Sequence, residues 1–466
     1  MKTGRKTVGL YIEKKLSEAM AQKVEAGPLG RVFDEFVRWL VERLERTPIV
    51  TFRFQVPRLA VSPFGYLGTL TAIVFLILGI TGGLLMFYYR PDVRLAYDSV
   101  KEIEENIEFG FFLRNIHYHA SNAMVFLAIA HLFYQYFSGR YKVKNEVIWV
   151  TGIILGTVTV LEAFTGYDLI LNQRAMLAVN IAVGLTNSAP LLGPQMAPIL
   201  LGGGLYDLII RFYALHVFVL PMVMLLLVLV HFPRNLVFDP PVVAGVIGAI
   251  LVAGGLYPVD LGLKYDPTRA IVEVPEWYLT AIYAFIRTGL ERFTSGALLP
   301  LLFILFFLLI PFVDRSKKLS WRERPFLTAA GLSSIVLIIV TTVWGFYTTP
   351  RVDAFTAVYV EPLIFYPTLL FLITATFIIS YKYIAPPMSS PTRPAPKSRP
   401  VTIQLPYEWS VRVIMGLLAV IGILSLIAFQ QYLEGLKNLS LFNLGVVVML
   451  FGLIAHMYRH AMQQVK

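Results

Sequence analysis

The sequence predicts an all-α polytopic membrane protein, and three observations support this fold class. The chain has 466 residues, of which 57% are hydrophobic and only 15% are charged. Several apolar runs are longer than a buried helix of a soluble protein requires. A bilayer core of roughly 30 Å is crossed by about 20 helical residues. That length gives about ten spans, at residues 66–88, 113–137, 147–169, 213–232, 238–257, 297–313, 327–346, 363–384, 410–430 and 439–458.

The charges of the loops predict that both ends of the chain lie in the cytoplasm. Residues 1–50 are charged and amphipathic, and they contain no apolar core followed by a small-residue cleavage site. The loops at 140–146 and 314–324 are basic, whereas those at 98–108 and 259–276 are mixed or acidic. This asymmetry follows the positive-inside rule. It also accounts for the net charge of +11, so we expect no nucleic-acid binding.

The two ends of the chain differ from its apolar middle. Residues 31–45 form a predicted helix with an apolar stripe, which suits a helix lying on the membrane surface or one packed on a partner subunit. The stripe consists of Val32, Phe33, Phe36, Val37, Trp39, Leu40 and Leu44. We expect five segments: an N-terminal amphipathic segment (1–50), a four-helix core (51–235), a C-terminal domain (236–385), a Pro-rich linker (386–408) and a two-helix tail (409–466).

Five of the seven histidines lie in two predicted spans, at 117, 119, 131, 216 and 231. A single histidine in a membrane is more often an interhelical hydrogen-bond donor than a ligand. Here, however, His117 and His131 are 14 residues apart, which is about 21 Å along a helix and within about 40° of one face. His216 and His231 are 15 residues apart, about 22 Å with an offset of about 60°. Two such helices that face each other would form two bis-histidine sites.

These sites suit two haem groups held edge-on in a four-helix bundle. Ligation by two imidazoles leaves no open position for oxygen, so the pattern predicts electron transfer. His119 lies about 200° round the helix from His117 and is predicted to be structural. The chain contains no cysteine. Disulfides, cysteine-ligated clusters and haem attached covalently through cysteine are therefore excluded.

Glycines repeat the histidine interval in two other predicted spans. Glycine lets a flat ligand approach the backbone closely, although small residues are also ordinary in membrane-helix packing. Arg114 and Arg211 precede the first histidine of each pair, where they would neutralise haem propionates or extend toward the membrane surface. The glycines are paired at the interval that separates His117 from His131: Gly68 with Gly82, and Gly152 with Gly166.

Taken in order, these segments resemble cytochrome b of the quinol-oxidising cytochrome bc complexes. The resemblance covers roughly residues 30–350, and RFYALHVFVLP is more similar to the cytochrome b6 branch than to the mitochondrial one. Residues 263–350 resemble the separate small subunit of that branch, subunit IV, fused here to the same chain. The motifs are YYRPD (88–92), RNIH (114–117), WVTGIILGTVTVLEAFTGY (149–167), RFYALHVFVLP (211–221) and PEWY (275–278).

The resemblance implies a function and a set of partners. It implies two haem b groups, an outer one on His117 and His216 and an inner one on His131 and His231. Quinol would be oxidised at the outer face, with one electron passing to a Rieske iron–sulfur protein and onward to a c-type cytochrome or copper protein. The other electron would reach a quinone at the inner face through the haems, coupled to proton translocation. A homodimer in the plasma membrane of a prokaryote is also implied.

The PEWY residues Pro275, Glu276, Trp277 and Tyr278 are the candidate quinol-oxidation residues. Glu276 is a carboxylate at the edge of the bilayer that would accept a proton and carry it outward. Pro275 and the two aromatic residues form a stiff turn. Outside this context, Trp277 and Tyr278 would be an ordinary interfacial anchor.

The chain departs from the family pattern at four points. Val74 stands where the b6 branch has a haem-tethering cysteine, and Tyr134 stands where the family has an arginine after the second histidine. Ile170-Leu171 replaces Pro-Trp. Glu162 lies in an otherwise apolar span, where it would join a proton route or make a buried hydrogen bond.

Two other classes of protein fit parts of the pattern. One is the two-haem membrane anchor of a quinone-linked dehydrogenase, which would not need PEWY or a Rieske partner. The other is a cofactor-free, proton-coupled transporter whose histidines relay protons. An absorbance spectrum separates the transporter from the two haem-binding classes.

Overall fold

The computed structural model describes residues 28–44, 53–57, 62–142, 144–191, 193–232, 235–269, 271–348, 360–385 and 406–464. The chain forms two compact units, Met1–Thr47 and Pro48–Lys466. In the first unit, α2 (Pro28–Leu44) is the amphipathic helix that the sequence predicts, and Val32, Phe33 and Phe36 are exposed. Residues 1–27 and 45–50 of the predicted N-terminal segment and residues 386–405 of the predicted linker lie outside the described residues.

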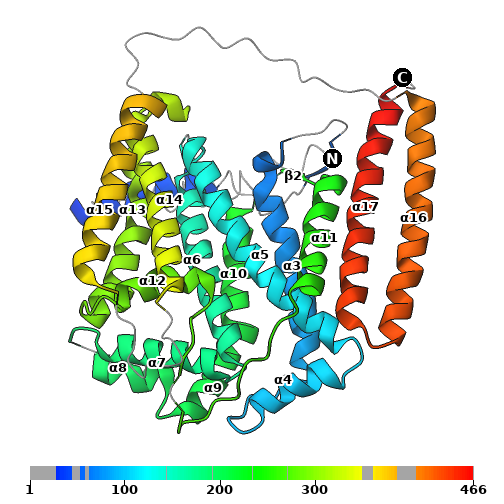
Figure 1. Cartoon of the computed structure of the whole chain (residues 1–466). Coiled ribbons are helices and arrows are strands. Elements are labelled where there is room, and N and C mark those ends of the chain that lie inside the picture. The colour runs from blue at the N-terminus through cyan, green and yellow to red at the C-terminus, as the bar shows by residue number, and fades with distance from the viewer. Residues whose placement is uncertain are drawn as a thin grey trace. The chain divides into compact units, whose positions relative to one another are not determined.

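The core of the second unit consists of α3 (Leu67–Met86), α5 (Gly110–Phe137), α6 (Glu146–Asp168) and the run of α9 (Leu205–Ala214), η2 (Leu215–Val219) and α10 (Leu220–His231) (Figure 1). A 3-10 turn, η1 (Pro63–Tyr66), leads into α3. α3 packs against α5, α5 against α6, and α6 against α10.

The last core segment changes its winding at η2. The N–H of Leu220 bonds to the carbonyl of Leu215, five residues back, so η2 is a π-helical turn. Pro221 has no N–H to donate to the carbonyl four residues before it. The proline therefore explains why the extra residue is accommodated at this point of the helix.

The loops between the core helices carry shorter helices. Figure 1 shows α4 (Ala96–Glu105), α7 (Gln173–Asn187) and α8 (Gly193–Leu201) at the same end of the bundle as α9. A three-residue strand β1 (Arg53–Gln55) pairs in parallel with β2 (Asn235–Val237).

The C-terminal part continues with further helices. α12 packs on α14, α14 packs on α15, and α13 packs on α6 of the core. The elements are α11 (Pro240–Leu256), α12 (Trp277–Ile286), η3 (Thr294–Leu298), α13 (Leu299–Val313), η4 (Trp321–Glu323), α14 (Pro325–Phe346), α15 (Pro362–Ile379) and η5 (Ser380–Ile384).

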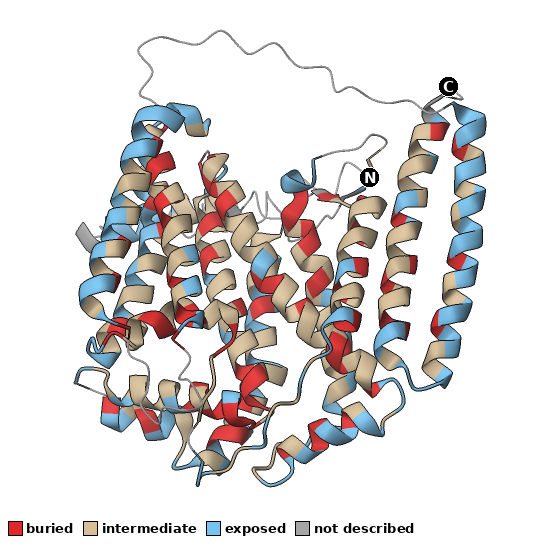
Figure 2. Cartoon of the chain, viewed as in Figure 1, coloured by how far each residue is buried: buried red, intermediate tan, exposed pale blue. Residues whose placement is uncertain are grey.

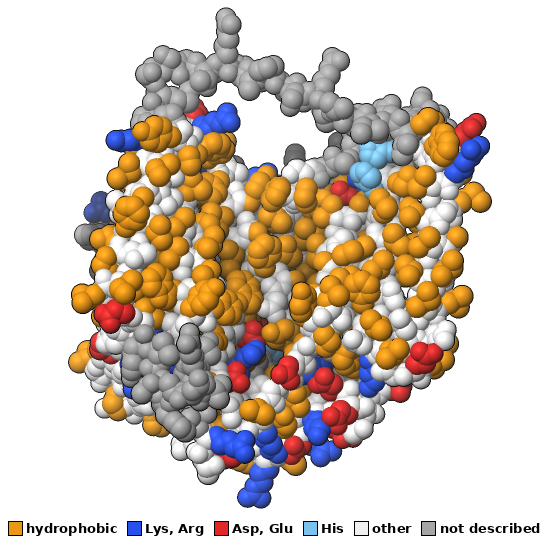
Figure 3. All heavy atoms as spheres, in the orientation of Figure 1, with side chains coloured by type: hydrophobic (Ala, Val, Ile, Leu, Met, Phe, Trp, Pro, Cys, Tyr) orange, Lys and Arg blue, Asp and Glu red, His pale blue; other side chains and the backbone are white. Residues whose placement is uncertain are grey.

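Among the described helices, eight are long and apolar enough to cross a membrane. They correspond to eight of the ten predicted spans. The remaining two are α5, which is made more polar by its histidines and Arg114, and α11, which has 17 residues. Hydrophobic side chains cover the middle of the helices on the face shown in Figure 3, and charged side chains gather near one end. The predicted all-α polytopic fold is confirmed.

The predicted two-helix tail is α16 (Tyr407–Leu433) and α17 (Lys437–Gln464), and α17 lies along α11 (Figure 1). A Cβ at Gly248 would lie 2.8 Å from the Gly445 carbonyl oxygen, so the two backbones approach each other closely at this point. At one end of this contact, Arg459 of α17 pairs with the buried Asp239 at 2.5 Å. The outward side of α16 is exposed (Figure 2), with Leu426 at 71% and Phe429 at 62%.

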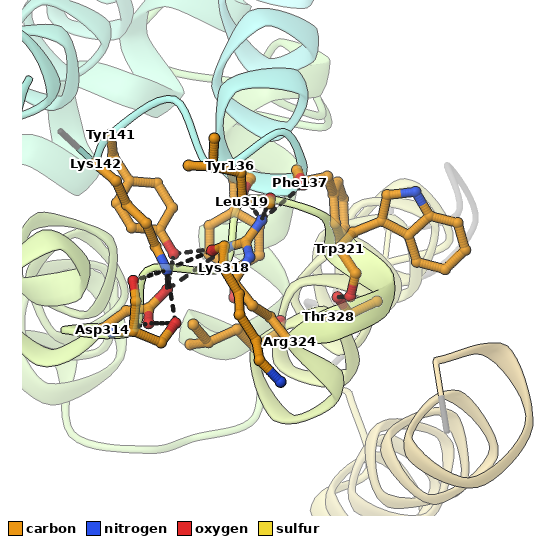
Figure 4. Close-up of polar contacts among 12 residues, drawn as sticks. Tyr136, Phe137, Tyr141, Lys142, Asp314, Lys318, Leu319, Trp321, Arg324 and Thr328 are labelled. Atoms are coloured by element: carbon orange, nitrogen blue, oxygen red, sulfur yellow. Dashed lines mark hydrogen bonds and ion pairs between the residues drawn. The ribbon is translucent and has the colours of Figure 1, made fainter. Parts of the chain in front are cut away.

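A buried polar network joins the core to the C-terminal part (Figure 4). Asp314 lies 2.6 Å from the Lys142 ammonium and accepts a 2.5 Å hydrogen bond from the Tyr141 hydroxyl. Arg324 donates to the Tyr141 hydroxyl at 2.7 Å and to the Phe137 carbonyl at 2.7 Å. We call Tyr141, Lys142, Asp314 and Arg324 the loop clamp. It ties the α5–α6 loop to the α13–α14 loop, and breaking one partner of such a buried pair is costly.

Candidate functional site

The four predicted ligand histidines form two pairs in the described core. The ring centres of His117 and His216, the first pair, are 6.2 Å apart with planes at 84°. Those of His131 and His231, the second pair, are 6.2 Å apart with planes at 87°. Metal–imidazole bonds of about 2.0–2.1 Å place the centres of two rings that share a metal about 6 Å apart. Both pairs therefore fit a shared metal ion.

The Nδ1 atoms of three of these rings are anchored to neighbouring helices. Nδ1 of His117 lies 2.9 Å from the hydroxyl of Thr81 on α3, which itself donates to the Ile77 carbonyl. Nδ1 of His231 lies 2.8 Å from the Ile148 carbonyl of α6. Nδ1 of His216 likewise lies 3.0 Å from the Glu162 carbonyl. Anchoring Nδ1 orients the ring and leaves Nε2 for a metal, as in other metal-binding histidines.

Each of the four predicted glycines faces a different one of the four histidine rings. A Cβ at Gly68 would lie 3.2 Å from the His131 ring, and one at Gly82 would lie 3.0 Å from His117. A Cβ at Gly152 would lie 2.6 Å from His231, and one at Gly166 would collide with His216. The glycines thus let α3 and α6 approach the rings, and any larger residue would displace them.

The helix α6 repeats one arrangement at both sites. His231 is contacted by a carbonyl, a threonine hydroxyl and a glycine of α6, which belong to Ile148, Thr151 and Gly152. His216 has the same three contacts with Glu162, Thr165 and Gly166, and each of these residues follows its counterpart at the interval that separates Gly152 from Gly166. Both threonine hydroxyls lie 3.5 Å from the respective Nδ1.

The spacing of the histidines differs between the two ligand helices by one residue. His216 lies in the π-helical turn η2, which takes up one extra residue. The interval from His216 to His231 across this turn is therefore structurally equivalent to the shorter interval from His117 to His131 in regular helix. The offset of about 60° expected for a straight helix is thereby replaced by the offset of about 40° that the shorter interval has.

A cavity of about 1760 Å³ extends from the second pair to the PEWY turn. His131 and His231 line it at one part, and Pro275, Trp277 and Tyr278 line it at another. Most of its remaining lining is aliphatic or aromatic, which suits an apolar ring compound. The His117 and His216 side chains do not line this cavity.

The Glu276 carboxylate is turned toward α5 and α7. It accepts a hydrogen bond from the Tyr118 hydroxyl at 3.1 Å and pairs with Arg174 at 3.2 Å. Arg174 also lies 3.7 Å from Glu273. Burial lowers the pKa of Arg174, but the Glu276 and Glu273 carboxylates outweigh burial and raise it, so the guanidinium stays charged. The PEWY carboxylate thus sits beside the residue that follows His117.

The predicted arginines have partners within the protein. Arg114 is buried and pairs with Glu104, and it donates to the Val259 carbonyl at 2.8 Å. Arg211 donates to the Pro198 carbonyl at 3.0 Å. These contacts compete with the predicted binding of propionates, which stays a prediction. His119 lies 2.9 Å from the Tyr257 carbonyl, a contact that fits its predicted structural role.

Sequence reasoning did not identify the partners of the site residues. Arg174, Tyr118 and Thr81 are the contacts it missed, and Arg174 was detectable as a cation close after the third span. Arg140 was also missed: it lines the cavity beside His131, with its guanidinium 5.1 Å from the ring centre of Tyr134. It offers a cation close to Tyr134, where the resemblance implies an arginine.

Together, the fold and the site define a multi-pass membrane protein with two histidine pairs, each spaced as for a shared metal ion. Residues 55–235 match the family "Cytochrome b/b6/petB", and residues 267–365 match "Cytochrome b(C-terminal)/b6/petD". Cytochrome b6 of Synechococcus sp. (strain JA-3-3Ab) is 39% identical over 209 residues, which are 44% of this chain and 94% of the relative. Cytochrome b6 of Porphyra purpurea is 36% identical over the same lengths.

A solved structure titled "Hyperthermophilic respiratory Complex III" shares the fold. It has a TM-score of 0.53 and 23% identity, and the match covers 73% of this chain and 94% of that one. The chain therefore belongs to the cytochrome b/b6 family, with the b6 part and the subunit IV-like part fused in one polypeptide. Membership implies b-type haem and a place in an oxidoreductase complex of the cytochrome bc class. α16 and α17 lie beyond the residues that match either family model.

Proposed function

We propose that the chain is the di-haem cytochrome b subunit that oxidises quinol beside the PEWY turn and delivers electrons to quinone at the other end of the bundle. Proton translocation accompanies this transfer. The observation that carries the proposal is the contact between Glu276 and Tyr118, because it places the PEWY carboxylate one residue from His117. No such link is needed in a protein that only anchors haem.

The first and second histidine pairs would each hold one haem b. A haem with two imidazole ligands carries single electrons and has no open coordination position. The chain's own contribution is to fix the rings. The hydroxyl of Thr81 and the carbonyls of Ile148 and Glu162 orient them, and the glycines opposite let the helix backbones approach the rings closely.

The PEWY turn supplies the quinol pocket. Pro275, Trp277 and Tyr278 line the apolar cavity, which excludes water from a bound ring. Glu276 is not among the lining residues, although its neighbours are, so its carboxylate must rotate to accept a quinol proton. When the protonated Glu276 side chain rotates back, it would return to its contacts with Arg174 and Tyr118. This rotation moves the proton away from the pocket.

The same proposal extends to partners and location. A Rieske iron–sulfur protein would take the first electron from each quinol and pass it to a c-type cytochrome or copper protein. The subunit would lie in a prokaryotic plasma membrane, and the basic loops support an orientation with both termini cytoplasmic, so that PEWY faces outward. The subunit would work as a homodimer.

A spectrum and one substitution test the proposal. Complex purified from native membranes should show about two b-type haems per chain and contain a Rieske protein. Glu276→Gln should lower quinol oxidation about 100-fold, the usual scale for losing a proton acceptor, while haem content is unchanged. Quinol-dependent reduction of the terminal acceptor measures the activity.

Glu273→Gln is the matched control, because Glu273 lies in the same loop and also faces Arg174. It should keep most of the activity. A colourless protein would instead favour a proton-coupled transporter. Two haems without a Rieske partner, together with full activity in Glu276→Gln, would favour a dehydrogenase anchor.

A further inference from the structure

The two histidine sites differ at one side chain of the arrangement that α6 repeats. The residue whose carbonyl anchors the histidine is Ile148 at the second pair and Glu162 at the first pair. Oε1 of Glu162 also lies 3.2 Å from Nδ1 of His216. A carbonyl and a threonine hydroxyl lie near the Nδ1–H of both His216 and His231, and only His216 has a carboxyl oxygen beside it as well.

Among the described residues, the Glu162 carboxyl makes its polar contact with His216. Its second oxygen, Oε2, is buried and has no hydrogen-bond partner among these residues. A carboxyl group inside a membrane helix is costly and needs a partner or a function. Since this carboxyl contacts His216 and no other polar group among the described residues, we infer that its effect passes through that ring.

A carboxyl oxygen on Nδ1–H changes what the ring offers to a metal. It draws the proton toward itself and makes the opposite nitrogen a stronger donor, as in carboxylate–histidine–metal triads. A stronger donor favours the oxidised, more positive iron over the reduced iron. The second pair lacks this influence, because Ile148 is apolar and Nδ1 of His131 has no partner among the described residues.

We propose that Glu162 is a positioning residue that lowers the midpoint potential of the metal centre held by the first pair relative to that held by the second. This inference rests on the proposed function, because it takes haem to be the group that the pairs bind. The potential difference would direct electrons from the first pair toward the second. Glu162 would thus favour transfer in that direction without touching substrate.

Potentiometric titration of the purified complex, followed by haem absorbance, tests the proposal. In Glu162→Gln, the reduced-to-oxidised ratio of the first-pair centre at a fixed potential should rise about tenfold, the lower end of the change in metal affinity or activity on removing such a partner. A tenfold change equals about 59 mV for a one-electron couple. Glu162→Ile, which copies the second site, should give the same rise and guards against an effect peculiar to glutamine.

The reciprocal substitution Ile148→Glu provides the matched control. It should lower the potential of the second-pair centre and leave the first unchanged. Equal first-pair potentials in wild type, Glu162→Gln and Glu162→Ile would overturn the inference while leaving the proposed function intact. Loss of the first-pair centre from both variants would assign Glu162 a purely structural role and also overturn it. A wild-type complex without haem would overturn the proposed function and this inference with it.

Discussion

The first and second histidine sites have the same ring spacing but different surroundings. At the first pair, Thr81 and Glu162 contact the rings, and Glu276 accepts a hydrogen bond from Tyr118, the residue that follows His117. At the second pair, a wide apolar cavity reaches the rings, and Nδ1 of His131 is buried without a partner among the described residues. Helix spacing thus fixes the geometry of the histidine rings, and side chains from α3, α5 and α6 make the two sites chemically distinct.

The largest expected effect is the loss of one metal centre when a glycine that faces a histidine ring is replaced. Each of these glycines faces one ring, so each substitution should affect one site. Gly166→Ala should lower occupancy of the first-pair centre about tenfold or more, since the added methyl group collides with His216. Gly152→Ala should do the same to the second-pair centre. Haem per chain, measured by absorbance, should fall from about two to about one in each variant.

Gly156→Ala is the control for both variants. It lies on the same helix, and a Cβ at this position meets no atom within 4 Å. Loss of both centres in Gly166→Ala would show that the two sites do not form independently.

The next effect concerns the loop clamp, which closes the bundle near the second pair, since Tyr141 also lines the cavity. Asp314→Asn leaves the buried Lys142 and Arg324 without their carboxylate and should destabilise the complex by about 3–5 kcal/mol. Thermal unfolding followed by haem absorbance measures the change. Asp266→Asn, an exposed aspartate in a loop, should change little.

The same clamp predicts a dependence on pH. Burial would raise the pKa of Asp314, but hydrogen bonds from Lys142, Tyr141 and Ser316 outweigh burial and lower it below its ordinary value. A carboxyl with a lowered pKa stabilises the fold above its unfolded pKa and loses that contribution as pH falls through the folded pKa. Wild-type stability should therefore fall on acidification below about pH 4, and Asp314→Asn should lack this part of the loss.

The smallest effect is expected at Thr81. Thr81→Val removes the hydroxyl that contacts Nδ1 of His117. The free energy with which the first-pair centre is bound should weaken by about 1 kcal/mol. Haem release under mild denaturant measures it. Thr71→Val on the same helix is the control, because its hydroxyl bonds to the Gly68 carbonyl and to no histidine. An equal effect at both positions would contradict a specific role for Thr81.

Much of the site could be predicted because it depends on helix periodicity. The intervals Gly68–Gly82 and Gly152–Gly166 equal the interval His117–His131, and each glycine does face a histidine. The ten predicted spans correspond to helices, since apolar length determines membrane crossing. The partners Arg174, Tyr118 and Glu104 could not be predicted, because their contacts depend on how loops and short helices pack in the tertiary structure.

The role of Glu162 shows the same limit. Its position in an apolar span indicated a function, but the sequence left a proton route and a buried hydrogen bond as alternatives. The difference from Ile148 becomes visible only when both residues are seen to hold equivalent histidines. Likewise, the tail could be predicted as two spans, whereas its close contact with α11 depends on glycines far apart in the sequence.

The π-helical turn at Leu215–Val219 has a consequence for how such chains are compared. Because it takes up one residue, a longer histidine interval with the turn and a shorter interval without it are structurally equivalent. A gain or loss of a single codon at this point would then leave both rings in place, although it would rotate every later side chain of a straight helix. If proteins were grouped by the number of residues between their paired histidines, proteins with equivalent sites would be placed in different groups.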